Sequence, residues 1–281
     1  MDTLDTLATG GYTEIVDSLD PRGVLTLTLN RPERRNPIGP VTVGELLHAL
    51  ERAERDAQVR AVVITGAGKV FSAGGDLSAM SGNAQPGGTP LAAGAGGSTP
   101  SIPGTFADLN VVLAGRGIGK PTIAMVNGHA LAGGLGLVVA CDLAIAADDA
   151  QFATPEINVG LWPMMIMSTI FRNVPRKRAM ELILTGDRIS AAEAERIGLI
   201  TRAVPRERLR DEVSALCDTL VQKSPIVTRL GLSAYHQMQD QALEPALRFL
   251  EGELARVLGT EDALEGLSAF LQKRPPTFTG R

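Results

Sequence analysis

The sequence NGHALAGGLGLVVACD, residues Asn127–Asp142, combines a turn and an apolar helix, and the rest of the chain is best understood from it. Before it, Thr122–Val126 is apolar and β-branched, which is typical of a buried strand. Gly133 and Gly134 fall where the pattern changes to an apolar helix. A strand, a glycine turn and a helix N-terminus present free backbone N–H groups to one point, where an anion or a developing oxyanion can bind.

A second glycine turn follows another short strand upstream. Ala61–Thr65, AVVIT, is apolar and β-branched, and it runs into Gly66–Asp76, GAGKVFSAGGD. A glycine pair after one strand is more often a tight turn than part of a catalytic site. Two such turns, however, can supply one N–H group each to a single carbonyl oxygen.

Glu156 is the residue that we predict to transfer protons. It lies in the otherwise uncharged segment Phe152–Gly160, FATPEINVG, directly after Pro155. A carboxyl group in apolar surroundings tends to have a raised pKa, which suits a general acid or base.

These motifs resemble those of the crotonase (enoyl-CoA hydratase/isomerase) superfamily. The similarity extends from about Val24 to Lys273, in order and with the spacing of the family. The matching motifs are Phe71–Leu77 (FSAGGDL), Asn127–Gly134 (NGHALAGG), Cys141–Asp142, Phe152–Gly160 and Leu184–Asp187 (LTGD). The resemblance implies an α/β fold in which ββα units form a spiral, and it implies binding of an acyl-CoA thioester.

Composition and charge argue against several other classes of protein. With 281 residues the chain can bury a large core in one or two domains, and its net charge of −4 gives no surface suited to nucleic acid. No apolar segment spans a membrane without glycines or charges, and the acidic N-terminal residues lack the pattern of a signal peptide. The two cysteines fit a reducing compartment, so we expect a cytoplasmic enzyme.

No separate cofactor is expected. The spacing of His, Cys, Asp and Glu matches no metal site, and the glycine pairs match neither a P-loop nor a dinucleotide motif. Coenzyme A would enter as part of the substrate.

Hydrophobic periodicity divides the chain into two parts. In residues 1–204 short strands alternate with helices, which favours an α/β core with parallel strands, whereas residues 205–281 are helical. Further strands are expected at Val24–Asn30, Leu143–Ala147 and Leu199–Val204. Thr42 and Ser190 are each expected to cap the start of a helix. The other expected helices are Phe106–Arg116, Arg176–Leu184, Leu209–Val221, Pro225–Met238, Leu243–Leu258 and Glu261–Leu271. Arg31–Pro40, with three prolines, is expected to be irregular, and Ser81–Pro103, rich in Gly and Pro, to be a mobile loop. The resemblance implies that residues 205–281 form a trimerisation region, giving a homotrimer or a dimer of trimers.

The resemblance also assigns roles to individual residues. The backbone N–H groups of Ala73 and Gly133 would form an oxyanion hole for the thioester carbonyl, and Glu156 would be the acid or base. The residues expected to contact the substrate or its CoA are Arg34, Asn36, Ala73, Gly75, Asp76, Leu77, Gly133, Trp162, Phe270 and Lys273. The last two would act from the helical C-terminal part, which packs on a neighbouring subunit.

The acid–base residues differ from those of the family's hydratases. Those enzymes use two glutamates, one matching Glu156 and one three residues after the oxyanion-hole glycine, where this chain has Gly136. One glutamate can move a proton between two carbons of a 3-enoyl chain, so Glu156 alone favours double-bond isomerisation. The bulky segment Trp162–Met167 favours it too if it forms a dry wall of the acyl pocket, although such methionines more often lie in a core.

Two alternatives stay open. The first is an enoyl-CoA hydratase in which Glu156 works with water or with an acid located elsewhere. The second is a non-catalytic acyl-CoA binder, or an enzyme of other thioester chemistry.

Overall fold

A computed structural model describes residues 11–76 and 104–281 of the chain. Its elements in order are β1 (Ile15–Leu19), β2 (Val24–Leu29), η1 (Pro32–Arg34), α1 (Pro40–Arg55), β3 (Ala61–Gly66), α3 (Phe106–Asn110), η2 (Val111–Arg116), β4 (Thr122–Val126), β5 (Ala130–Leu131), α4 (Gly133–Ala140), β6 (Leu143–Ala147), β7 (Gln151–Ala153), η3 (Pro155–Val159), α5 (Met164–Asn173), α6 (Arg176–Thr185), β8 (Ile189–Ser190), α7 (Ala191–Arg196), β9 (Arg202–Val204), η4 (Arg206–Arg208), α8 (Leu209–Val221), α9 (Pro225–Met238), α10 (Leu243–Leu258) and α11 (Glu261–Leu271). The predicted loop Ser81–Pro103 lies outside the described residues, and so does Leu77.

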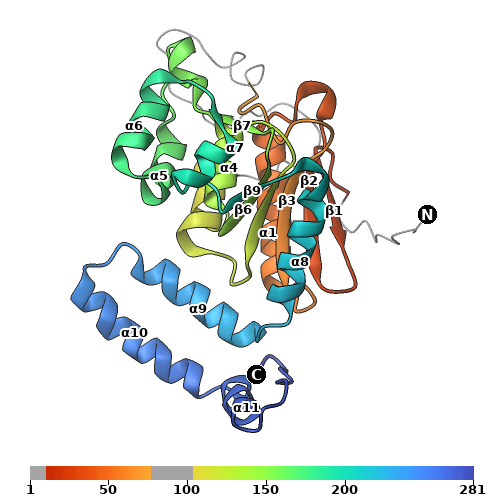
Figure 1. Ribbon diagram of the computed structural model, residues 1–281, viewed down its shortest axis with the longest axis vertical. Coiled ribbons are helices and arrows are strands. Elements are labelled where there is room, and N and C mark those ends of the chain that lie inside the picture. The colour runs from red at the N-terminus through yellow and green to blue at the C-terminus, as the bar shows by residue number, and fades with distance from the viewer. Residues whose placement is uncertain (1–10, 77–103) are drawn as a thin grey trace.

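The main sheet has the strand order β1-β2-β3-β4-β6-β9 (Figure 1). β1 and β2 are antiparallel, and each later pair is parallel. A smaller sheet, β5-β7-β8, pairs β5 with β7 in parallel and β7 with β8 in antiparallel. The strands predicted at Thr122–Val126 and Leu143–Ala147 are confirmed with those bounds, and the α/β class is confirmed with them.

Both faces of the main sheet are buried. Val62 and Ile64 of β3 belong to a core that also contains residues of α1 and α4. Ala61 and Val63 point to the other face, where they pack in a second core with residues of α8. Burial on both sides explains why these strands are apolar throughout rather than alternating with polar residues. It also means that α8 covers the sheet, although it lies within residues 205–281.

Helices α9, α10 and α11 form a lobe apart from the sheet (Figure 1). The predicted bounds of α8 and of these three helices are confirmed. The lobe is attached to the rest of the chain through Gln239, which donates a hydrogen bond to the Ala114 carbonyl oxygen over 3.0 Å, and through Arg172, which pairs with Asp240 over 2.8 Å. Its role in trimerisation stays a prediction.

Several local expectations are wrong. Helix α1 begins at Pro40 with Gly39 as its N-cap, so Thr42 lies inside the first turn. Pro32–Arg34 forms a short 3-10 helix, because the fixed φ of proline suits the first turn of a helix. The helix predicted over Phe106–Arg116, by contrast, is confirmed: α3 is followed without a break by the π-helical segment η2, which ends at Arg116.

The two cysteines are free thiols. Burial raises the pKa of Cys217 to about 11, and it raises the pKa of Cys141 as well. Both are therefore protonated near neutral pH. In the described parts of the chain, no helix combines the length and the apolar character needed to cross a membrane.

We predict that Glu45→Ala lowers the free energy of unfolding by about 3 kcal/mol, because backbone N–H groups lose a buried acceptor. The Glu45 carboxylate on α1 accepts hydrogen bonds from the N–H groups of Thr13, Glu14 and Ile15 over 2.7, 2.9 and 3.0 Å. Urea denaturation measures the change. Glu51→Ala on the same helix is the control, because Glu51 is exposed, and should alter stability by less than about 0.5 kcal/mol. Equal losses for the two variants would contradict the prediction.

Candidate active site

The two glycine turns lie side by side at the carboxyl ends of β3 and β4. Ser72 and Ala130 form an isolated parallel bridge, and the Leu131 N–H donates to the Ser72 carbonyl oxygen over 3.0 Å. The N–H groups of Phe71 and Ser72 donate to the His129 carbonyl oxygen over 3.1 and 3.2 Å. The structure therefore confirms that both turns meet at one place.

Two glycines make this contact possible. A Cβ atom added to Gly134 would lie 2.7 Å from the Cβ atom of Ser72. A Cβ atom added to Gly74 would lie 2.6 Å from the Cβ atom of Ala132, and Gly74 has a φ of 104°. Any side chain at either position would push the turns apart.

The N–H groups of Gly75 and Gly133 lie close together and donate no hydrogen bond to any residue in 11–76 or 104–281. A Cβ atom added to Gly133 would lie 3.7 Å from the Gly75 nitrogen. Gly133 begins α4, and the first N–H groups of a helix have no partner within it. Ala132 before it has a φ of 49°, a strained value for a residue with a side chain and one that is common at functional sites.

The prediction that Ala73 supplies an oxyanion-hole N–H is wrong. Its N–H donates to the Arg35 carbonyl oxygen over 2.9 Å. Beside it, Ile38 donates to the Gly74 carbonyl oxygen over 2.8 Å and accepts from the Asp76 N–H over 3.1 Å. This parallel bridge leaves the N–H of Gly75 on the other side of the segment. Gly75, predicted only as a contact residue, is therefore the better candidate donor.

Glu156 is attached to the same turn through the smaller sheet. The Ala132 N–H donates to the Ala153 carbonyl oxygen of β7 over 2.9 Å, and η3 follows with Glu156. The Oε2 atom of Glu156 is buried and has no hydrogen-bond partner among the described residues. Burial raises the pKa of Glu156, and a backbone hydrogen bond opposes this in part. Such a carboxyl group is suited to accept and return a proton.

Gly136 faces side chains that leave no room for a second carboxylate. A Cβ atom added to Gly136 would lie 2.2 Å from Cγ2 of Ile166 and 3.2 Å from Cζ of Phe106. Ile166, on α5, is buried. Sequence reasoning did not identify Ile166 and Phe106 as the residues that fill this place. The sequence features that could have indicated this packing are the glycine inside an apolar helix and the bulky segment Trp162–Met167 further along the chain.

The rest of Trp162–Met167 does not form a single wall. Met164 and Met165 are exposed over 63% and 51% of their surface, so the core interpretation is wrong for these two methionines. The indole N–H of the half-buried Trp162 lies 3.3 Å from the sulfur of Met167. The predicted contact of Trp162 with substrate stays a prediction.

The predicted contact of Asn36 with CoA is wrong. Its side chain is 1% exposed, and its Nδ2 donates to the carbonyl oxygens of Ala67 and Val70 over 2.9 and 2.8 Å. Its Oδ1 accepts from the Arg31 N–H over 3.0 Å. Asn36 therefore holds the loop before α1 against the first glycine turn.

Direct contact of the Asp76 carboxylate with substrate is also not supported. The carboxylate is buried and pairs with Arg31 and with Arg34, over 3.2 Å in each case. Asp76 thus positions two guanidinium groups rather than binding a ligand itself. The Arg34 side chain is 44% exposed, and its contact with CoA stays a prediction.

Phe270 and Lys273 do not join this site within one chain. They lie at the end of α11, in the lobe remote from α4 (Figure 1), and Phe270 is 81% exposed. Their predicted action on a neighbouring subunit stays a prediction.

Comparison with known proteins shows which family the chain resembles. A family model described as enoyl-CoA hydratase/isomerase matches residues 20–281. The probable enoyl-CoA hydratase echA8 of Mycobacterium tuberculosis is 36% identical over 271 residues, which cover 96% of this chain and 99% of that protein. The 2,3-dehydroadipyl-CoA hydratase of Escherichia coli is 34% identical over 269 residues, which cover 95% of this chain and 99% of that protein.

Solved structures give the same result. The enoyl-CoA hydratase of Mycobacterium smegmatis has a TM-score of 0.83 and 33% identity, covering 95% of this chain and 99% of that one. That of Bacillus anthracis has a TM-score of 0.83 and 29% identity, covering 96% of this chain and all of that one (100%). The expected crotonase fold is therefore confirmed, and the chain is an enzyme that belongs to the enoyl-CoA hydratase/isomerase family.

Proposed function

We propose that this enzyme converts a 3-enoyl-CoA to the 2-enoyl-CoA with Glu156 as its acid–base group. The observation that carries the proposal is the environment of Gly136, the position of the second glutamate in the hydratases. Ile166 and Phe106 fill that space, so a second carboxylate cannot be placed there. The site then has one carboxyl group for proton transfer and an apolar side chain where a hydratase would activate water.

The thioester carbonyl oxygen would accept hydrogen bonds from the N–H groups of Gly75 and Gly133. Removal of a proton from C2 of the acyl chain transfers negative charge to that oxygen, where both donors stabilise it. One donor of this kind is worth about 3 kcal/mol in the transition state. The N-terminus of α4 adds a favourable potential at the same point.

Glu156 would take the proton from C2 and return it to C4. The double bond moves from C3–C4 to C2–C3, and the reaction consumes neither water nor an oxidant. A half-buried carboxylate with a raised pKa holds the proton between the two steps more readily than an exposed one.

A second candidate is hydration of a 2-enoyl-CoA, which the names of the relatives favour. Hydration needs one group that activates water and one that delivers the proton at C2. With Gly136 in the place of one of them, a different group would have to act with Glu156.

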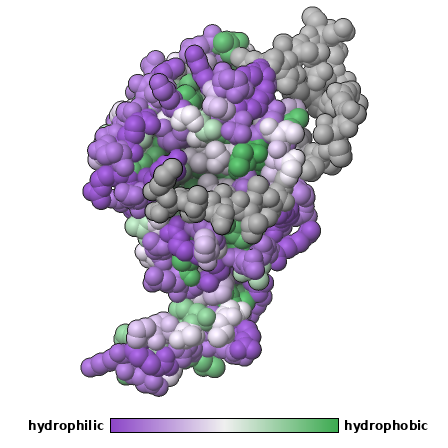
Figure 2. All heavy atoms as spheres, turned by 90° about the vertical axis from the view of Figure 1, so that its right-hand side faces the viewer, coloured by the Kyte–Doolittle hydropathy of each residue, from purple (hydrophilic) through white to green (hydrophobic). Residues whose placement is uncertain are grey.

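The lobe supports the proposal that the chain forms a homotrimer or a dimer of trimers. Large apolar side chains of α10 and α11 are exposed over more than half of their surface: Leu243, Leu247, Leu254, Leu258, Leu264, Leu267, Phe270 and Leu271. Figure 2 shows green, apolar areas on this lobe beside purple, hydrophilic ones. An exposed apolar surface of this kind is typical of a protein–protein interface.

Three further features belong to the same proposal. Coenzyme A enters as part of the acyl-CoA substrate, and the reaction uses no other cofactor. Arg34 contacts its polar part. The enzyme acts in the cytoplasm.

We predict that Glu156→Gln lowers kcat for conversion of 3-enoyl-CoA to 2-enoyl-CoA by about 10²–10⁴-fold, because general acid–base catalysis is lost. Affinity for CoA should stay unchanged, since the substitution preserves size. Mass spectrometry of the products from 2-enoyl-CoA and from 3-enoyl-CoA measures both reactions. Glu207→Gln, at an exposed residue of η4, is the control and should keep full activity.

Three results would redirect the proposal. Rapid formation of 3-hydroxyacyl-CoA by the wild type would favour the hydratase. No turnover of either substrate would favour binding or other thioester chemistry. Full activity of Glu156→Gln would contradict the role of this residue.

The raised pKa of Glu156 predicts two pH dependences. As a base Glu156 must be ionised, so kcat/KM should increase with pH through a pKa above the ordinary value of 4.5. A carboxyl group whose pKa is raised by partial burial, as that of Glu156 is, stabilises the folded state in its protonated form. That contribution is present below 4.5 and is lost as pH rises through the raised pKa. Urea denaturation of the wild type and of Glu156→Gln over this range should show the wild type losing stability relative to the variant.

We predict that Gly136→Ala lowers the free energy of unfolding by about 2 kcal/mol, because its Cβ atom collides with Ile166. Ile166→Ala alone should cost about 3 kcal/mol through the cavity that it leaves. The double variant should lose less than the sum by about 1 kcal/mol, since the smaller side chain makes room for the new one. Additive losses in urea denaturation would show that Gly136 and Ile166 are not in contact.

A further inference from the structure

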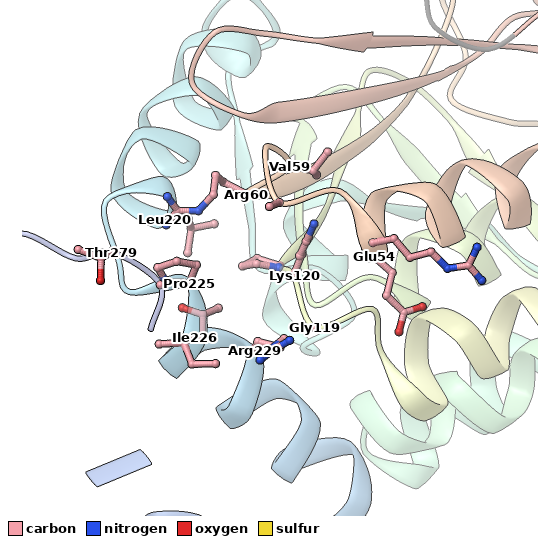
Figure 3. Close-up of a pocket in the computed structure, with 15 residues that line it drawn as sticks. Glu54, Val59, Arg60, Gly119, Lys120, Leu220, Pro225, Ile226, Arg229 and Thr279 are labelled. Atoms are coloured by element: carbon pink, nitrogen blue, oxygen red, sulfur yellow. The ribbon is translucent and has the colours of Figure 1, made fainter. Parts of the chain in front are cut away.

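A cavity lies at the opposite edge of the main sheet from the glycine turns. Its volume is about 290 Å³, and its lining includes Arg60 and Lys120, which precede β3 and β4. Residues of α9 and of the C-terminal segment complete it (Figure 3). Because β3 and β4 are parallel, their amino ends meet here and their carboxyl ends meet at the active site.

Three cationic side chains from different elements, Arg60, Lys120 and Arg229, line this cavity (Figure 3). Within residues 11–76 and 104–281, none of them forms an ion pair. Arg60 instead donates to the Lys223 carbonyl oxygen over 2.7 Å. The Lys120 ammonium donates to two backbone carbonyl oxygens at the end of α1. An ammonium group has three hydrogens, so one donor of Lys120 remains for a ligand.

The lining of the cavity carries four cationic side chains, Arg55, Arg60, Lys120 and Arg229, and one carboxylate, that of Glu54. Burial lowers the pKa of Lys120, the carboxylates of Glu54 and Asp56 raise it, and the positive charges of the two arginines lower it again. Glu54, which lines the cavity, is engaged by Arg116 over 3.0 Å. Arg55, also in the lining, pairs with Glu51. The cavity therefore keeps an excess of positive charge in a chain whose net charge is −4.

Gly119 fixes the path of the Arg229 side chain. Its φ is 68°, and a Cβ atom on it would lie 2.8 Å from Cγ of Arg229. The stem of Arg229 can therefore lie directly over the turn before β4. The remaining lining combines apolar side chains with two hydroxyl groups: Leu220, Pro225, Ile226, Thr228 and Thr279.

We propose that this cavity binds a small phosphorylated organic molecule, with its phosphate group held by Arg60, Lys120 and Arg229. Guanidinium and ammonium groups bind phosphate through charge-assisted hydrogen bonds, and the phosphate would relieve the repulsion among the three cations. The apolar part of the lining would receive the carbon part of the ligand. Since Arg229 belongs to α9 while Arg60 and Lys120 belong to the sheet edge, the bound phosphate joins the lobe to the sheet.

Isothermal titration calorimetry of the full-length protein with phenyl phosphate, at constant ionic strength, tests this proposal. One molecule should bind per chain, and more tightly than inorganic phosphate, because the ring contacts the apolar lining. Arg229→Gln should weaken binding about tenfold through the loss of a charge-assisted hydrogen bond. Arg176→Gln, at an exposed arginine of α6, is the matched control and should leave the affinity unchanged.

The alternative explanation for any affinity is binding next to Arg34, which is predicted to contact CoA. Two further titrations test it, one with Arg34→Gln and one of the wild type with CoA present. Unchanged binding in both supports the cavity. The proposal is overturned if phenyl phosphate does not bind, if Arg229→Gln binds as well as the wild type, or if Arg34→Gln or CoA abolishes binding.

Discussion

The turns after β3 and β4 touch each other, and their contact requires two positions without side chains. Gly74 and Gly134 provide these positions, and Ser72 and Ala132 are the residues that they approach. The contact brings the start of α4 next to the N–H group of Gly75. β5, which follows the second turn, pairs with β7, and η3 with Glu156 follows β7. The position of Glu156 therefore depends on the contact between the turns as well.

Much of this architecture could be predicted from the sequence. Runs of apolar and β-branched residues predicted β3, β4 and β6, and periodicity predicted the bounds of the last four helices. Ser190 accepts a hydrogen bond from the Glu193 N–H over 3.2 Å, as the spacing of these two residues predicted. Such features are local, because strand and helix patterns and caps depend on residues that are near in sequence.

The predictions that failed concern the direction of backbone N–H groups and the packing of side chains, which depend on residues far apart in the sequence. Ala73 and Gly75 are both small residues in one glycine-rich turn, and only the pairing with Arg35 and with Ile38 decides which N–H group remains without a partner. Asn36 looks like a polar loop residue in the sequence, yet it is buried because its own loop and the loop after β3 both form hydrogen bonds with its amide. The neighbours of Gly136 come from segments on both sides of α4, so no pattern within one element could have revealed them.

The order of strands in the main sheet is the order of strands in the chain. Each strand of the main sheet therefore pairs with the preceding strand of that sheet, and a growing chain can extend the sheet at one edge during synthesis. β1 forms the first edge, and the Glu45 carboxylate holds its start once α1 has been made. α8, which covers the second face, follows β9 and the short η4, so it is made only after the last strand. The second face of the sheet therefore lacks its covering helix until residues 209–221 have been made.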